Sequence, residues 1–200
     1  MTTLLQLNTS LFAENGQSSK LANEFVAAWQ ARQADGRVIV RDLAQQPLPH
    51  LDAARFGAFL AKPEERTAEQ QAVVAESDAL IAELKAADVI VLGLPLYNFG
   101  VPSQLKAWID HVARAGVTFR YTATGPEGLV GGRKLYVFAA RGGKYLGTPA
   151  DTQTGFIQSF FNFIGITDIE FVYAEGLNLG EAPKQLALRE AAAQIDRLAA

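Results

Sequence analysis

One apolar stretch constrains this chain more than any other feature. Residues 88–94 consist of valine, isoleucine and leucine apart from Asp88 and Gly93. Such a run is typical of a central parallel strand buried on both faces, because a half-exposed strand alternates apolar and polar residues. Pro95 ends the run, and an amphipathic helix is predicted to begin at Ser103. A sheet that is covered by helices on both faces is therefore expected.

The rest of the chain supplies the other elements of such a sheet. Four further strands are predicted at residues 3–7, 37–41, 135–139 and 168–173. Five helices are predicted at residues 18–34, 67–86, 103–115, 152–164 and 181–199, with a short helical patch at 53–60. Thr67 and Gln70 resemble a capping box. Residues 116–132 are predicted to be a polar, glycine-rich loop.

This alternation predicts an α/β fold with a doubly wound parallel sheet and helices on both faces. Of the two common strand orders, 2-1-3-4-5 fits five strands better than the six-strand order. The 200 residues, 49% of them hydrophobic, are enough for one domain over residues 1–200. In this strand order, ligand loops should follow strands 1, 3 and 4.

Composition excludes several classes of function. The net charge is −3 and there is no basic run, which argues against nucleic acid as a partner. There are no cysteines, so disulfides, thiolate zinc sites and thiol catalysis are excluded. His50 and His111 lack a carboxylate cluster, so no metal site is predicted. No signal peptide or membrane-spanning stretch is recognised, and a cytoplasmic location is expected.

Three loops carry the candidate chemistry. Residues 10–19 place hydroxyls at a helix start, which suits a phosphate, although Ser18 and Ser19 could simply cap the helix. Tyr97 and Phe99 could be core aromatics or could face a planar ligand. Gly142 and Gly143 form a tight turn or allow the backbone to approach a ligand edge. A phosphate cradle with two loops that flank a flat ring predicts FMN.

The resemblance to one family is specific. The motifs are found at residues 95–99, 104–106, 113–121, 125–129 and 141–143, and the similarity spans nearly the whole chain. In these segments the chain resembles the FMN-dependent NADH azoreductases, which are also called NADH:quinone oxidoreductases. The resemblance implies a flavodoxin-like homodimer with one FMN per subunit near the dimer interface. It also implies that NADH or NADPH reduces the FMN in a ping-pong cycle, with quinones and aromatic azo compounds as acceptors.

The resemblance also assigns residues to the FMN. It places the phosphate at Ser10, Gly16, Gln17 and Ser18; the isoalloxazine at Leu96, Tyr97, Asn98 and Phe99; and the pyrimidine side at Ala140, Arg141, Gly142 and Gly143. Leu96 stands where the family often has methionine, and Gly16 and Ala140 where it often has serine. No catalytic side chain is assigned, because the flavin itself transfers the hydride.

Five aromatic residues are candidates for the acceptor pocket: Phe119, Tyr121, Tyr145, Phe56 and Phe59. Phe119 and Tyr121 could instead anchor a loop, and Phe56 and Phe59 could instead cover the neighbouring subunit. Tyr145 could lie beside the flavin. The competing function is a flavodoxin-like electron carrier without its own NAD(P)H-dependent activity. Such carriers usually present a strongly acidic docking face. The balance of 18 basic against 21 acidic residues does not favour one. The sequence does not distinguish NADH from NADPH.

Overall fold

The computed structural model describes residues 1–199, so Ala200 lies outside the described residues. Five parallel strands form the main sheet in the order β2-β1-β3-β6-β7. They are β1 (Thr3–Asn8), β2 (Arg37–Asp42), β3 (Val89–Pro95), β6 (Lys134–Ala140) and β7 (Asp168–Ala174). Because β6 and β7 are the fourth and fifth strands of this sheet along the chain, the predicted order 2-1-3-4-5 is confirmed.

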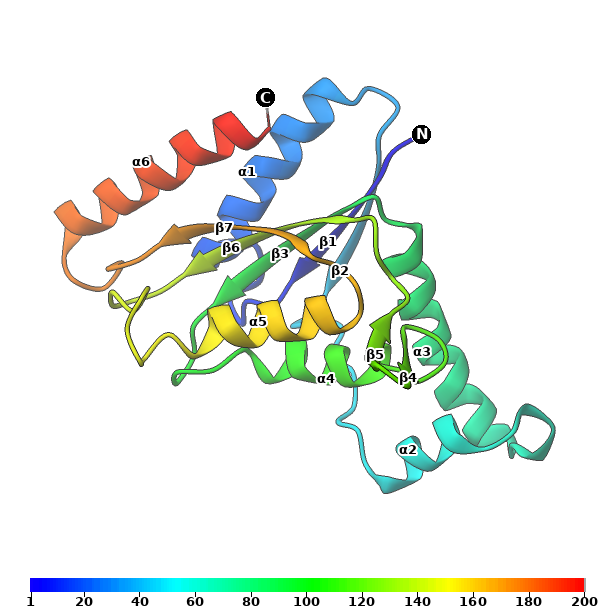
Figure 1. Ribbon diagram of the computed structural model, residues 1–200. Helices are drawn as coiled ribbons and strands as arrows, with labels where there is room; N and C mark the ends of the chain where they lie inside the picture. Colours follow the sequence, from blue (N-terminus) through cyan, green and yellow to red (C-terminus); the bar gives the residue numbers. More distant parts are fainter. Residues whose placement is uncertain (200) are drawn as a thin grey trace.

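Helices cover both faces of the sheet (Figure 1). They are α1 (Gln17–Arg32), α2 (Ala53–Leu60), α3 (Ala68–Ala86), α4 (Ser103–Val112), α5 (Thr152–Phe163) and α6 (Glu181–Leu198). Buried residues of α1 and α6 pack on one face, and those of α3, α4 and α5 pack on the other. The capping box of α3 is confirmed, since Thr67 and Gln70 exchange both hydrogen bonds. No helix within residues 1–199 is long and apolar enough to cross a membrane.

Strand β3 forms the middle of the core. Ile90, Leu92 and Leu94 face α3, α4 and α5, and Val91 points to the opposite face, where α1 and α6 pack. All four side chains are completely buried. Burying a side chain of this size contributes roughly 1.5–3 kcal/mol, which explains why both sets of positions along the strand are apolar. The ends of the strands are therefore where a ligand can reach the sheet.

The glycine-rich segment at 116–132 is not only a loop. It contains a separate antiparallel hairpin of β4 (Phe119–Thr122) and β5 (Gly125–Gly128). Sequence reasoning missed these strands because they are four residues long, mostly polar and include Pro126, which usually argues against a strand. Contacts outside the hairpin hold it in place: the Phe119 ring lies 4.3 Å from that of Phe163.

Helix α4 ends at Val112, three residues earlier than the predicted end at residue 115. The Thr118 hydroxyl donates a hydrogen bond to the Val112 carbonyl at 2.6 Å and accepts one from the Arg114 N–H at 2.9 Å. These are backbone groups that a longer helix would pair internally. A side chain six residues beyond the helix end therefore terminates it, and no local pattern predicts this.

The hairpin meets the segment after α5 at two glycines. A Cβ at Gly128 would lie 2.1 Å from the Gly165 backbone nitrogen, and Gly165 itself has φ +101°. We therefore expect Gly128→Ala to lower the free energy of unfolding by roughly 2–3 kcal/mol, the cost of forcing atoms into a packed contact. Gly57→Ala in α2 is the matched control, because a Cβ there meets no atom within 4 Å.

Denaturant unfolding of both variants measures this difference. The control should be neutral or stabilising by up to about 1 kcal/mol, since alanine restricts the unfolded chain. Equal stability of the two variants would contradict the close approach of the hairpin to Gly165.

Candidate cofactor site

The loops after β1, β3 and β6 meet at the carboxyl edge of the sheet around a cavity of about 250 Å³. The residues that line it are Ser10, Phe12, Gly16, Gln17, Ser18, Pro95, Leu96, Tyr97, Ala140, Arg141, Gly142, Leu177 and Asn178. Of the residues predicted to bind a cofactor, only Asn98, Phe99 and Gly143 are absent from this lining. Each of these three adjoins other predicted residues in its loop.

The first loop leaves polar groups unpaired at the start of α1. Gly16 is the N-cap residue, and no side chain caps the helix, so the alternative capping role of Ser18 and Ser19 is wrong. Both serine hydroxyls are buried and have no hydrogen-bond partner among residues 1–199. An unpaired buried hydroxyl costs about 1–3 kcal/mol. The Ser18 hydroxyl and the first N–H groups of α1 thus suit a bound anion.

Gly16 lies against the side chain of Ser10. A Cβ at position 16 would be 2.0 Å from the Ser10 Oγ. Any side chain at position 16 would therefore require the Ser10 side chain to move. The missing Cβ lets the start of α1 pack directly on the first residue of the loop.

The second loop contains a strained turn. Asn98 and Phe99 have φ values of 50° and 58°, in the left-handed region. The Gly100 N–H donates to the Tyr97 carbonyl at 3.0 Å, and the Tyr97 N–H donates back to Gly100 at 3.4 Å. Non-glycine residues in this conformation cost roughly 1–2 kcal/mol each. The turn therefore needs support from elsewhere in the molecule.

That support comes from the first residues of α5. The Gln153 side-chain amide donates to the carbonyls of Pro95 and Gly100, at 2.9 and 3.0 Å. The Thr152 hydroxyl donates to the Phe99 carbonyl. Three carbonyls in and around the turn are thus held by two neighbouring side chains.

The hydroxyl of Tyr97 joins the second loop to the first. It lies 3.3 Å from the Ser10 Oγ and accepts a hydrogen bond from the Leu11 N–H at 3.2 Å. The residue predicted to face a planar ligand therefore also fixes the backbone of the first loop.

The third loop leaves two backbone donors free. The carbonyls of Gly142 and Gly143 accept hydrogen bonds from Asn178 N at 3.0 Å and Gly176 N at 2.8 Å. The N–H groups of Gly142 and Gly143 have no acceptor within residues 1–199. A Cβ at position 142 would lie 2.5 Å from the Asn178 Nδ2. Glycine at 142 thus keeps the backbone close to the segment that follows β7.

The side chain of Arg141 is committed to partners within the protein. It is fully buried and forms ion pairs with Asp151 at 2.8 Å and Glu175 at 3.1 Å. The Tyr173 ring lies 5.0 Å from the guanidinium. Burial of Asp151 opposes ionisation, but hydrogen bonds from Arg141 and Thr154 outweigh it and hold the pKa of this carboxyl below its ordinary value. The charge of Arg141 is therefore paired within the protein, and of its donors the buried Nε–H has no partner among residues 1–199.

The five aromatic candidates do not line the cavity in this chain. The Tyr145 ring makes an edge contact with Phe99 at 5.7 Å. Phe119 and Tyr121 belong to the hairpin, where their rings lie 5.6 Å apart. Phe56 is exposed on α2, and Phe59 packs beneath the guanidinium of Arg114 at 5.0 Å. Their role in an acceptor pocket stays a prediction.

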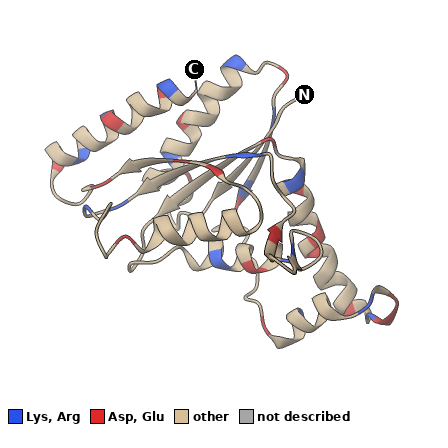
Figure 2. Cartoon of the chain, viewed as in Figure 1, with Lys and Arg blue, Asp and Glu red and all other residues tan. Residues whose placement is uncertain are grey.

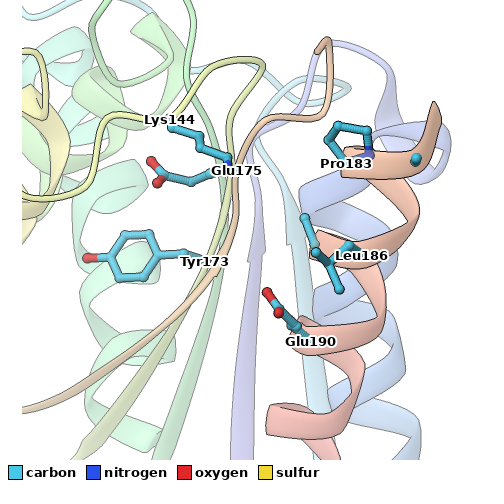
Figure 3. A pocket seen from close by; sticks show the side chains of 8 residues that line it. Lys144, Tyr173, Glu175, Pro183, Leu186 and Glu190 are labelled. Carbon is cyan, nitrogen blue, oxygen red and sulfur yellow. The ribbon is translucent and has the colours of Figure 1, made fainter. Parts of the chain in front are cut away.

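A larger cavity, of about 560 Å³, lies between the end of β7 and α6 (Figure 3). Its charged lining residues are Lys144, Glu175 and Glu190, and Glu175 is already paired with Arg141. None of the predicted cofactor-binding residues lines it. The smaller cavity therefore remains the candidate site.

Sequence reasoning missed four residues of that site: Phe12, Pro95, Leu177 and Asn178. Pro95 ends the predicted strand and begins the motif at residues 95–99, but no cofactor contact is predicted for it. Leu177 and Asn178 follow the fifth strand, after which no ligand loop was expected. Their hydrogen bonds to Arg141 and Gly142 bring them to the cavity. Of these four residues, only Phe12 could have been predicted from the sequence, because it lies inside the first loop.

Comparisons with known proteins agree with this geometry. A family model described as a flavodoxin-like fold matches residues 2–199. An FMN-dependent NADH:quinone oxidoreductase from Cellvibrio japonicus is 57% identical over 187 residues, which is 94% of each chain. One from Burkholderia lata is 56% identical over 188 residues, which is 94% of this chain and 95% of the relative.

Solved structures show the same likeness. An azoreductase from Bacillus anthracis superimposes with a TM-score of 0.92 and 30% identity, over 100% of this chain and 99% of the other. An FMN-dependent NADH-azoreductase from the same species, in complex with FMN, gives 0.89 and 28% over the full length of both chains. The resemblance predicted from the motifs is thereby confirmed: the chain has a flavodoxin-like fold and belongs to the family of FMN-dependent NADH:quinone oxidoreductases.

Proposed function

We propose that this protein is an FMN-dependent oxidoreductase that passes two electrons from NADH or NADPH to quinones and aromatic azo compounds. The observation that carries the proposal is one cavity with two sets of unused donors. Ser18, whose hydroxyl is unpaired, and Gly142, whose N–H is free, both line the cavity, and the free N–H of Gly143 belongs to the next residue of the third loop. These donors fit a phosphate at one end and the polar edge of a ring at the other.

The residues present fit FMN in three parts. Ser10, Gly16, Gln17 and Ser18 hold the phosphate; Leu96, Tyr97, Asn98 and Phe99 line the isoalloxazine; and Ala140, Arg141, Gly142 and Gly143 meet its pyrimidine side. Contacts at Gly16 and Ala140 come from the backbone, since these residues have no hydroxyl. The Arg141 side chain acts through its ion pairs, because it is buried against Asp151 and Glu175.

Bound FMN supplies the redox chemistry by accepting a hydride from the nicotinamide and delivering two electrons to the acceptor in a ping-pong cycle. The chain's own residues orient the partners. Phe12, Leu96 and Leu177 supply apolar lining that excludes water from the ring. Gly142 and Gly143 aim N–H donors at negative charge that develops on the ring. No general acid is assigned, since neither histidine lies in these loops.

We also propose a single cytoplasmic domain that works as a homodimer with one FMN per subunit. Large apolar side chains are exposed on loops at the carboxyl edge of the sheet, among them Phe12 (67% exposed), Phe99 (57%) and Leu179 (58%). A second subunit would cover such residues. It could also bring Phe56, Phe59 or Tyr121 to the acceptor pocket.

The alternative, an electron carrier, usually presents a strongly acidic docking face. In the view of Figure 2, acidic and basic residues are interspersed along the helices. This mixed distribution of charged residues along the chain supports the enzyme over the carrier.

The enzyme and carrier functions give different results with purified protein loaded with FMN. Under anaerobic conditions, NADH or NADPH alone should bleach the visible flavin absorbance, and a quinone should restore it. The measurement is the absorbance after each addition, with free FMN as control. A protein that retains FMN but is not bleached by either nicotinamide would contradict the enzyme function.

Ser18→Ala should separate stability from binding. The hydroxyl has no partner in the FMN-free protein, so its removal should leave the free energy of unfolding unchanged or raise it. The dissociation constant for FMN should rise about tenfold, as expected for losing one hydrogen bond to a charged phosphate. Ser19→Ala is the matched control, because that hydroxyl is equally unpaired but does not line the cavity. Equal affinity of both variants for FMN would refute the placement of the phosphate.

Tyr97→Phe tests the junction of the first two loops. It removes the hydroxyl that contacts Ser10 and the Leu11 N–H, so we expect weaker FMN binding by roughly tenfold. Tyr136→Phe is the control, because Tyr136 packs on Phe25 in the core rather than at the cavity. Fluorescence titration of flavin into FMN-free protein measures both variants. Unchanged binding by Tyr97→Phe would mean that the first loop holds its shape without this contact.

A further inference from the structure

A buried ion-pair cluster is centred on Arg141, which lines the cavity, while the two carboxylates of the cluster do not line it. Arg141 is 1% exposed, and its guanidinium is shared by Asp151, Glu175 and the Thr154 hydroxyl. An unpaired buried charge would cost several kcal/mol, so these contacts fix the arginine firmly. They tie together the ends of β6 and β7 and the start of α5, three segments that are distant in the sequence.

One arm of the cluster runs through Glu175 to the third loop. Its Oε1 accepts the N–H groups of Tyr145 at 2.9 Å and Leu146 at 3.0 Å while it also pairs with Arg141. Figure 3 shows Glu175 and Tyr173 projecting from the end of β7 away from α6. The Glu175 carboxylate therefore fixes the position of the backbone at Tyr145 and Leu146, shortly after Gly143.

The other arm runs through Asp151 to the second loop. Asp151 caps α5 by accepting the Thr154 N–H at 3.1 Å, which fixes the direction in which that helix begins. The next two residues, Thr152 and Gln153, donate to the carbonyls around the strained turn at Asn98 and Phe99. The cost of that turn is thus offset by contacts whose geometry depends on Asp151.

The two arms meet again where the rings of Phe99 and Tyr145 are in edge contact. Replacing buried ion pairs by apolar residues is often neutral or stabilising, so such pairs are weak evidence for a role in stability alone. Here the three charged side chains of Arg141, Asp151 and Glu175 lie next to the contacts that hold the second and third loops in place. None of Asp151, Thr152, Gln153 and Glu175 lines the cavity.

We propose that the Arg141–Asp151–Glu175 cluster positions both the 97–100 turn and the 142–146 loop for the cofactor. Thr152, Gln153 and Glu175 are then positioning residues that act through these loops. The proposal rests on the proposed FMN binding, and it also makes a claim about the FMN-free protein. In that protein the cluster already holds both loops in place.

Two variants probe the arms. Thr152→Val keeps the size of the side chain but removes its donor to Phe99, and Thr152→Ser restores the hydroxyl. Glu175→Gln removes a charge next to Arg141. Its matched control is Glu83→Gln, which weakens the pair of Arg41 with Glu83 on β2 and α3, away from the cavity.

Amide hydrogen exchange of FMN-free protein is the first readout. Thr152→Val should speed exchange within residues 96–100, and Glu175→Gln within residues 143–146, by tenfold or more. Thr152→Ser and Glu83→Gln should exchange at the wild-type rate in these segments. Wild-type exchange in both test variants would overturn the proposal, and this result does not depend on whether FMN binds.

The dissociation constant for FMN is the second readout, measured together with the unfolding of FMN-free protein. We expect Thr152→Val and Glu175→Gln to raise the constant about tenfold, with Thr152→Ser close to the wild type. A fall in stability without a change in FMN affinity would show that the cluster serves only the fold. Wild-type protein that fails to bind FMN would instead contradict the proposed function.

Discussion

The structure depends on the burial of β3 on both faces. Ile90 and Leu92 pack against helices on one side, and Val91 packs on the other. No ligand can reach the strand through these layers, so it must approach at the strand ends. Parallel strands all direct their carboxyl ends to the same edge, and the loops from β1, β3 and β6 therefore share one cavity. The apolar core thus determines where the polar chemistry can be.

The edge itself is assembled by contacts between distant parts of the chain. Asn98 and Phe99 adopt a conformation that they would avoid in isolation, and α5 holds it through Thr152 and Gln153. Tyr97 reaches back to the first loop. Strain that is held in place by surrounding structure is common where a ligand must be met by a prearranged surface. The donors left unused, at Ser18 and at Gly142 and Gly143, are the groups that remain for the ligand.

The sequence predicted those features that local pattern determines. The apolar run ended by Pro95 identified β3, and Thr67 with Gln70 identified the start of α3. The alternation of elements indicated a doubly wound sheet, and the number of strands favoured the order 2-1-3-4-5 over the six-strand order. Local sequence pattern does not predict the features that tertiary contacts determine. The hairpin at β4 and β5 has no strand pattern of its own, and α4 is ended by Thr118.

The candidate site divides in the same way. Loop positions follow from the strand order, and most of the residues that the family resemblance assigns within these loops line the cavity. The inward turn of the Arg141 side chain depends on Asp151 and Glu175, which lie 10 and 34 residues away in sequence. Asn178 reaches the site only because its backbone pairs with Gly142. Neither contact leaves a periodicity or a motif in the sequence.

The most direct measurement is a crystal structure of the protein with FMN. The account predicts the phosphate at the start of α1, within hydrogen-bond distance of the Ser18 hydroxyl, and the ring beside the Gly142 and Gly143 N–H groups. A flavin seated in the cavity between β7 and α6 would contradict it, as would crystals whose carboxyl-edge cavity stays free of flavin at saturating concentration.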